Sequence, residues 1–245
     1  MKGFFAKNPI AVVTGAGTGI GRAIALGLAE KGAAVVLVGR TRRTLEDVAK
    51  KAATHKKGQT CCFQGDVTSE KDLQRLAGIL ERDYGGVDIL VHSAGLIHTE
   101  SFLSASLDNF ERQFHTNVLA PYALTQVLLE MLIVREGQVV FINSTAGLNA
   151  GANVSQYAAT KHALKAMADS LRAEVNPKGV RVLSVFPGRT ATPMQEAVHR
   201  SEGKPYFPER LLQPEDVAAM VLAALALPRT AEVTDLMIRP MMKPA

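Results

Sequence analysis

The sequence is poor in cysteine and in aromatic residues. Its 245 residues include only two cysteines, Cys61 and Cys62, no tryptophan, and 5% aromatic residues in total. Two adjacent cysteines in a strand-like run point to opposite faces, so they cannot form a disulfide framework or a metal-ligand set. We therefore expect two partly buried small apolar side chains, no metal site, and a reducing compartment, most simply the cytoplasm.

The chain also lacks a long apolar run and a cluster of positive charge. Its longest uninterrupted apolar stretch runs from Val217 to Leu227, well short of the roughly 20 residues that cross a bilayer. Lys7 and Pro9 interrupt the N-terminal segment, so no secretory signal is apparent. The net charge of +5 is spread along the chain, which favours anionic small molecules over nucleic acid. We expect neither a membrane nor a nucleic acid as partner.

Short β-branched runs alternate with longer segments of helical periodicity. The runs are apolar throughout, which is typical of a parallel sheet covered by helices on both faces. The pattern predicts a single α/β domain over residues 1–245, with a doubly wound, Rossmann-type, mainly parallel sheet of seven strands. The predicted strands lie at residues 10–14, 34–39, 60–65, 87–93, 137–144, 180–188 and 233–240.

One long stretch of irregular composition follows the sixth predicted strand. It runs from Pro187 to Pro214 and carries three further prolines and Gly203. Doubly wound sheets bind their ligands beyond the carboxyl ends of the strands, where this stretch lies. We therefore predict a substrate lid at about residues 188–213.

A glycine-rich turn joins the first predicted strand to a helix that we expect to begin at Arg22. The turn reads TGAGTGIG, ending at Gly21, and its bare backbone allows close approach to an anion at a helix N-terminus. A GxGxxG fingerprint would need glycine at position 20, which is Ile20; the spacing is TGxxxGxG instead, with Gly15, Gly19 and Gly21. Taken alone, such a turn also occurs as a tight connection without a ligand.

Tyr157 and Lys161 lie four residues apart in a helical pattern, so their side chains emerge from one face. A phenol with an ordinary pKa of about 10 exchanges protons poorly at neutral pH, and a neighbouring cation lowers that pKa. Lys161 can supply the cation. Taken alone, however, a Tyr/Lys pair at this spacing more often lies on the exposed surface of a helix and has no catalytic role.

Two further residues give the Tyr/Lys pair a context. Ser144 ends the fifth predicted strand, and Asn117 lies in the helix that precedes that strand. With the glycine turn, these residues resemble the short single-domain branch of the short-chain dehydrogenase/reductase family over almost the whole chain. The resemblance implies that Tyr157 is the general acid/base and that Lys161 lowers its pKa and clamps the ribose. It also implies that Ser144 donates a hydrogen bond to the substrate oxygen and that Asn117 anchors a water in the proton relay.

The resemblance further implies a nicotinamide cofactor. In NAD-binding sheets an acidic residue ends the second strand and binds the ribose 2′-hydroxyl, whereas Arg40 stands there in this sequence. Arg40 and Arg42 can pair with a 2′-phosphate, so we expect NADP(H), with NAD(H) less favoured. The alternative for Arg42 and Arg43 is a solvated helix surface. Other positions that match the family's cofactor contacts are Gly15, Thr18, Gly19, Ile20, Gly21, Asp66, Val67, Ser93, Ala94, Gly95, Tyr157, Lys161, Pro187, Gly188, Thr190 and Thr192.

Two segments depart from the family pattern. His92 and Ser93 replace two asparagines that usually follow the fourth strand, and Thr190 stands where an aliphatic residue is more usual. We interpret His92 as a structural residue rather than a catalytic one.

The implied reaction is hydride transfer between nicotinamide and a carbonyl or secondary alcohol of a small molecule, with reduction by NADPH as the expected direction. One alternative is a 3-oxoacyl-carrier-protein reductase, and another is a non-catalytic NADP(H)-sensing protein on the same fold. The resemblance also implies a homodimer or homotetramer. Basic residues relevant to the first alternative are Arg135, Lys178, Arg189, Arg200, Lys204 and Arg210.

Expected substrate contacts are Ser144, Leu148, Asn149, Tyr157 and Met194, with Leu96, Ile97, His98, Tyr206 and Phe207 as further candidates.

Overall fold

The structure is a computed structural model that describes residues 4–54 and 59–242. A seven-stranded sheet runs through its centre in the order β3-β2-β1-β4-β5-β6-β7, and every pair of neighbouring strands is parallel. The predicted doubly wound sheet is therefore confirmed, and it is parallel throughout. The strands are β1 (Ile10–Thr14), β2 (Ala34–Gly39), β3 (Thr60–Gln64), β4 (Ile89–His92), β5 (Gln138–Ile142), β6 (Arg181–Pro187) and β7 (Asp235–Ile238).

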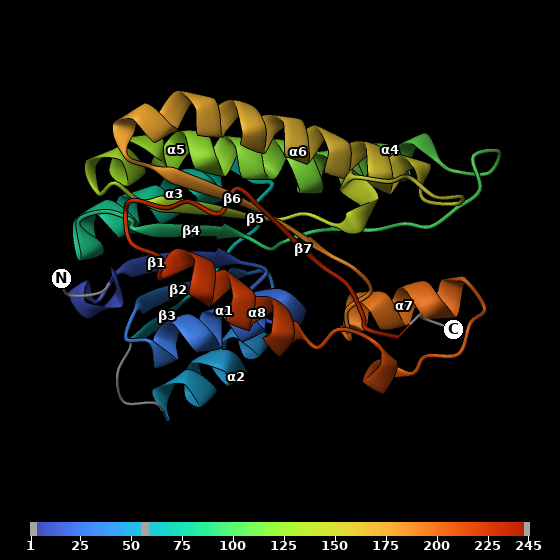
Figure 1. Cartoon of the computed structure of the whole chain (residues 1–245), viewed down its shortest axis with the longest axis horizontal. Helices are drawn as coiled ribbons and strands as arrows, with labels where there is room; N and C mark the ends of the chain where they lie inside the picture. The colour runs from blue at the N-terminus through green and yellow to red at the C-terminus, as the bar shows by residue number, and fades with distance from the viewer. Residues whose placement is uncertain (1–3, 55–58, 243–245) are drawn as a thin grey trace.

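Helices cover both faces of the sheet (Figure 1). One face carries α1 (Gly19–Glu30), α2 (Arg42–Ala53) and α8 (Pro214–Leu225), and the other carries α3 (Glu70–Ile79), α4 (Leu107–Phe114), α5 (Ala120–Val134) and α6 (Ser155–Val175). Two π-helical turns, Leu80–Tyr84 and His115–Leu119, extend α3 and join α4 to α5. The short 3-10 turns are Phe4–Lys7, Thr145–Gly147, Asn176–Lys178 and Pro208–Arg210.

The sheet separates two apolar cores, which explains why consecutive positions of its central strands are mostly apolar. In β1, Ala11 and Val13 belong to the core beneath α1 and α8, whereas Val12 belongs to the core beneath α5 and α6. Successive side chains of a strand point to opposite faces, so a strand with helices on both sides buries each of them.

The strand order reverses between β1 and β4, and this places the glycine turn at the carboxyl edge of the sheet. The helix after the turn begins at Gly19, three residues before the predicted start at Arg22, and Thr18 is its N-cap. Gly15 has a φ of 65°, and a Cβ there would lie 2.8 Å from the Ala94 nitrogen of the loop after β4. Glycine is thus required for the two loops to approach each other.

The predicted lid is more regular than its composition suggested. It contains α7 (Pro193–Ser201), which lies beyond the carboxyl edge of the sheet (Figure 1). Thr192 caps α7 by accepting a hydrogen bond from Gln195 N at 3.1 Å, and proline suits the first helical position because its missing N–H has no partner there. The expectation of an irregular stretch was therefore wrong for its middle third.

The helical run Leu107–Val134 is long and apolar enough to cross a membrane by length and composition, since an 18-residue window within it has a mean hydropathy of 1.5. A search for uninterrupted apolar runs misses this segment because polar residues such as Thr125 and Glu130 divide it, although the mean over the window stays high. Core helices pass the same test, and 44% of this window is buried within the protein. The absence of a membrane partner stays a prediction.

Candidate active site

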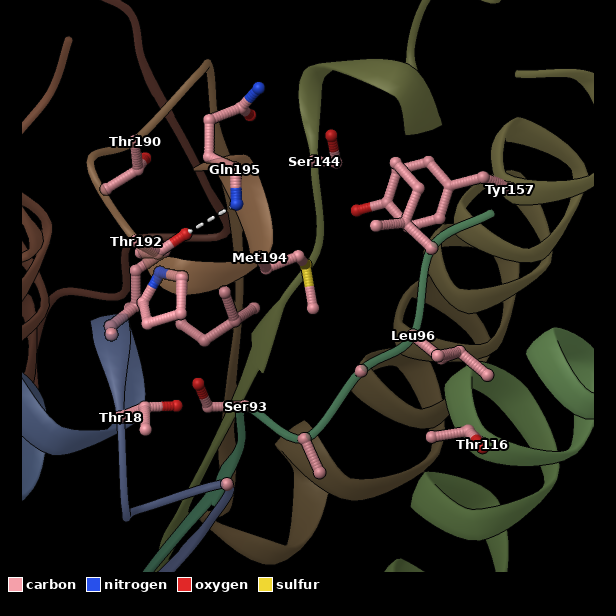
Figure 2. Close-up of a pocket in the computed structure, with 18 of the residues that line it drawn as sticks. Thr18, Ser93, Leu96, Thr116, Ser144, Tyr157, Thr190, Thr192, Met194 and Gln195 are labelled. Carbon is pink, nitrogen blue, oxygen red and sulfur yellow. Dashed lines mark hydrogen bonds between the residues drawn. The ribbon is translucent and has the colours of Figure 1, made fainter. Parts of the chain in front are cut away.

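A cleft of about 760 Å³ lies along the carboxyl edge of the sheet. Its walls come from the loops after β1 to β6, from the start of α6, and from α7 (Figure 2). Most of the predicted site residues meet there, although they are spread over almost 180 residues of sequence. The predicted residues that line the cleft are Gly15, Thr18, Gly19, Ile20, Arg40, Asp66, Val67, Ser93, Ala94, Gly95, Ser144, Tyr157, Lys161, Pro187, Gly188, Thr190, Thr192 and Met194.

Two predicted substrate contacts, Leu148 and Asn149, do not line the cleft. Ser144 accepts a hydrogen bond from Ala146 N at 3.1 Å and caps the 3-10 turn Thr145–Gly147. This turn carries the chain away from the cleft, so Thr145 and Ala146 take the wall positions instead. The prediction was wrong because a short turn after a strand leaves no periodic pattern in the sequence.

The N-terminus of α1 forms the centre of the cleft floor. Its cap, Thr18, makes no side-chain capping hydrogen bond, and the glycines on either side of it also line the cleft. Gly21 is buried behind them, since a Cβ there would lie 2.4 Å from the Gly15 carbonyl oxygen. Free N–H groups at a helix N-terminus attract a phosphate, so this part of the cleft suits the diphosphate of a dinucleotide.

At the end of β2, Arg40 lines the cleft, whereas Arg42 does not. Arg42 Nε lies 2.7 Å from Glu46 Oε1 on the exposed surface of α2, so the structure favours the helix-surface alternative for this residue. Arg40 lies across from Asp66. Burial on its own raises the pKa of Asp66, but hydrogen bonds from Thr68 and the charge of Arg40 together lower it.

Tyr157 and Ser144 face the same space from α6 and from the end of β5 (Figure 2). Burial raises the pKa of Tyr157 to about 12, and an interaction with the Ser144 side chain opposes this only in part. Burial also lowers the pKa of Lys161 to about 8. The Lys161 ammonium lies 5.7 Å from the centre of the Tyr157 ring and donates to the Ile142 carbonyl at 3.0 Å. Burial therefore dominates the pKa of Tyr157 in this geometry, and the lowering of that pKa by Lys161 stays a prediction.

Asn117 lies in the π-helical turn between α4 and α5 and is buried. Its amide nitrogen donates to Leu96 O at 2.8 Å and to Thr160 Oγ1 at 3.0 Å, and its amide oxygen accepts from Leu96 N at 2.8 Å. Both amide hydrogens are thus used within the protein. The side chain fixes the loop after β4 against α6, and its role as a water anchor stays a prediction.

His92 has the environment of a structural residue, as expected. Its Nε2 lies 2.8 Å from Thr125 Oγ1, and its ring stacks on Phe141 at 4.8 Å. Burial lowers the pKa of His92 to about 3, so the ring is neutral at physiological pH.

Polar contacts brace the lid internally and join it to the loop after β4. Arg189, which follows β6, donates to both carboxylate oxygens of Glu202 at 2.7 and 2.9 Å, and Lys204 also pairs with this carboxylate. At the far end of α7, Ser201 Oγ lies 2.7 Å from Thr99 Oγ1 of the loop after β4. These contacts hold α7 over the space into which Tyr157 points.

Sequence reasoning missed several cleft residues. Val198 of α7 and Glu202, its C-cap, continue the four-residue spacing that begins at the predicted Met194, and both line the cleft. That spacing, preceded by Thr192 and a proline, is a helix-start signal that could have revealed this face. Other missed wall residues are Thr41, Thr44, Thr99, Arg112, His115, Thr116, Val154 and Gln195.

Comparison with known proteins agrees with this geometry. Residues 9–203 match the family described as short chain dehydrogenase. An uncharacterized oxidoreductase of Staphylococcus aureus is 34% identical over 234 residues, which cover 95% of this chain and 97% of the relative.

Two solved structures share the fold over nearly the whole chain. An alcohol dehydrogenase from the archaeon Thermococcus sibiricus, complexed with 5-hydroxy-NADP, has a TM-score of 0.87 at 27% identity and covers 97% of this chain and 99% of its own. A 7α-hydroxysteroid dehydrogenase complexed with NADH and 7-oxo glycochenodeoxycholic acid has a TM-score of 0.85 at 27% identity, covering 94% of this chain and 92% of its own. The chain therefore belongs to the short-chain dehydrogenase family of oxidoreductases.

Proposed function

We propose that this protein uses NADP(H) to interconvert a carbonyl and a secondary alcohol on a small molecule. One observation carries the proposal: Ser144, Tyr157 and Lys161 meet in a single cleft whose floor is an anion-attracting helix N-terminus. A proton-transfer group beside a dinucleotide cradle is what a hydride-transfer enzyme requires.

The residues of the cleft fit a phosphorylated dinucleotide. Gly15 and Gly21 have no Cβ at positions where a Cβ would collide with main-chain atoms. Thr18, the N-cap of α1, lines the cleft, so the N-terminus of this helix faces it. Arg40 lies in the cleft wall, and among the described residues it forms no ion pair with a carboxylate, so it can pair with a 2′-phosphate. The two solved relatives carry cofactors of both kinds, so the choice of NADP(H) rests on Arg40. When bound, the nicotinamide would supply or accept the hydride.

The protein's own part is to hold the carbonyl and to supply a proton. With a pKa of about 12, Tyr157 is protonated at neutral pH, so in the reductive direction its hydroxyl donates to the substrate oxygen as negative charge develops there. Ser144 would donate a second hydrogen bond to the same oxygen. Lys161, with a pKa of about 8, is mainly cationic at neutral pH and stabilises the phenolate that remains.

The structure lends little support to the acyl-carrier-protein alternative. That reading needs free basic side chains, but Arg189 is bound by Glu202, and Arg135 donates to the carbonyls of Tyr84 and Gly85. The wall near Tyr157 instead includes Met194, Val154 and Val198. We propose a small carbonyl compound with an apolar substituent as substrate.

The proposal is tested by following NADPH oxidation with a panel of small ketones and aldehydes, with Tyr157→Phe as the control. We expect turnover by the wild-type protein that falls about 10²–10⁴-fold in the variant, and weaker activity with NADH. Tight NADPH binding without turnover on any panel member would indicate the sensing alternative. Higher catalytic efficiency with NADH would overturn the assignment of the cofactor.

A further inference from the structure

A second buried amide, one helical turn before Asn117, is not used by the mechanism above. Gln113 of α4 is completely buried, and it makes three hydrogen bonds to three different parts of the chain. Its amide oxygen accepts from His98 N at 3.0 Å. Its amide nitrogen donates to Asn109 O at 3.2 Å and to Gln156 Oε1 at 3.0 Å.

The direction of these bonds is fixed by their backbone partners. The His98 N–H can only donate, so the Gln113 oxygen must face it, and the Asn109 carbonyl can only accept, so the nitrogen must face that side. The same logic applies to Gln156, whose nitrogen donates to the Ser106 carbonyl at 2.9 Å. Its oxygen is therefore left to accept from Gln113. The two glutamines thus form a chain of hydrogen bonds, here called the relay, which runs from His98 in the loop after β4 through Gln113 to Gln156 at the start of α6.

Each end of the relay reaches a functional segment. Gln156 precedes Tyr157 in the first turn of α6, and the N-cap of this helix, Val154, provides no side-chain capping hydrogen bond. At the other end, His98 lies between Ile97 and Thr99, which both line the cleft. Thr99 also contacts the lid through Ser201.

We propose that Gln113 is a positioning residue that sets the distance between the substrate wall and Tyr157. Asn117 already clamps Leu96 against α6 through Thr160, and Gln113 clamps His98 against α6 through Gln156. Two parallel amide clamps fix the loop at two points, which prevents it from pivoting. Gln113 touches neither the reacting atoms nor the cofactor cradle, so its effect is on the carbonyl substrate. This inference rests on the proposed function.

The test replaces Gln113 with methionine, which keeps the length of the side chain and removes all three hydrogen bonds. Misplacement of a substrate by about 1 Å lowers rates up to about a hundredfold, so we expect kcat/KM for the best carbonyl substrate to fall about tenfold or more. The loss should appear mainly in kcat, because the substrate is misplaced relative to Tyr157, and the Kd of NADPH should stay unchanged. Gln138→Met is the matched control, because Gln138 is equally buried and donates to Leu225 O at the opposite edge of the sheet.

Gln156→Met provides a second test, since Gln156 is only partly buried and its variant is expected to fold even if Gln113→Met does not. It should lower kcat in the same way, and the double variant should be little worse than either single one, because both changes break the same chain of hydrogen bonds. Equal losses in the Gln138 control, a parallel loss of NADPH binding, or additive effects would overturn the proposal. A wild-type protein without turnover would instead contradict the proposed function.

Discussion

The guanidinium of Arg189 binds both carboxylate oxygens of Glu202, at 2.7 and 2.9 Å. The pair joins the end of β6 to the end of α7, and both side chains are mostly buried. Burial alone raises the pKa of Glu202, but the hydrogen bonds and charges of Arg189 and Lys204 together lower it. The contact thus stabilises the closed position of the lid at neutral pH, and it weakens as pH falls through the lowered pKa of the carboxyl.

Glu202→Gln should loosen the lid, because it removes the charge that holds Arg189 and keeps the shape of the side chain. A charge-assisted pair contributes about 1.5–3 kcal/mol, so we expect the KM of the carbonyl substrate to rise about tenfold. Glu196→Gln is the control, since Glu196 meets Arg200 at 3.8 Å on an exposed face and such pairs contribute little. Steady-state kinetics distinguish the two variants, and equal KM values would show that the lid does not depend on this pair.

Arg40→Ala should weaken NADPH binding and leave NADH binding almost unchanged. The expected loss is about tenfold or more, because a charge-assisted hydrogen bond to phosphate is lost. The matched control is Arg42→Ala, which removes an arginine that pairs with Glu46 outside the cleft. Calorimetry of both variants with both dinucleotides decides the matter. Similar losses in the two variants would mean that a diffuse positive field, and not Arg40, selects the cofactor.

Because of Lys161, the free energy of unfolding of the cofactor-free protein should rise as the pH increases above neutrality. Its pKa is lowered by burial from 10.5 to about 8, so between these values the unfolded chain binds a proton that the folded chain has released. The free energy of unfolding therefore rises with pH, by up to about 3 kcal/mol over the whole interval. Denaturant titrations between pH 8 and pH 9.5, compared with Lys161→Met, measure this contribution. Parallel pH profiles for the two proteins would contradict it.

Gly21→Ala should damage the glycine turn, because the new Cβ would lie 2.4 Å from the Gly15 carbonyl oxygen. We expect a loss of about 1–3 kcal/mol in the free energy of unfolding together with weaker binding of NADPH. Gly78→Ala in α3 is the control, because a Cβ there meets nothing within 4 Å and alanine favours the helix by about 0.5–1 kcal/mol. Thermal melts with and without NADPH report both effects. A Gly21 variant as stable as the wild type would disprove close packing at the turn.

Local sequence patterns predicted most of the fold correctly for a physical reason. Strands such as β1 and β5 are buried on both faces, so their apolar character is continuous and visible without knowledge of partners. The start of α1 was misplaced by three residues, because its first turn contains Gly19 and Gly21, which are weak helix formers. The helix in the lid was missed because the prolines around it suggested an irregular chain.

The sequence by itself determined the chemistry of this protein: which residue types are present, their spacing on a helix, and the order of strands and helices. Tertiary structure alone decided which of them meet. Arg40 and Arg42 are equivalent in charge, yet Arg40, in the loop after β2, lines the cleft, whereas Arg42 begins α2 and pairs with Glu46 on the surface of that helix. Gln113 and Gln156 are 43 residues apart, and nothing in either segment reveals the other. The hydrogen bonds between these two segments depend on packing geometry, which neither segment's local pattern encodes.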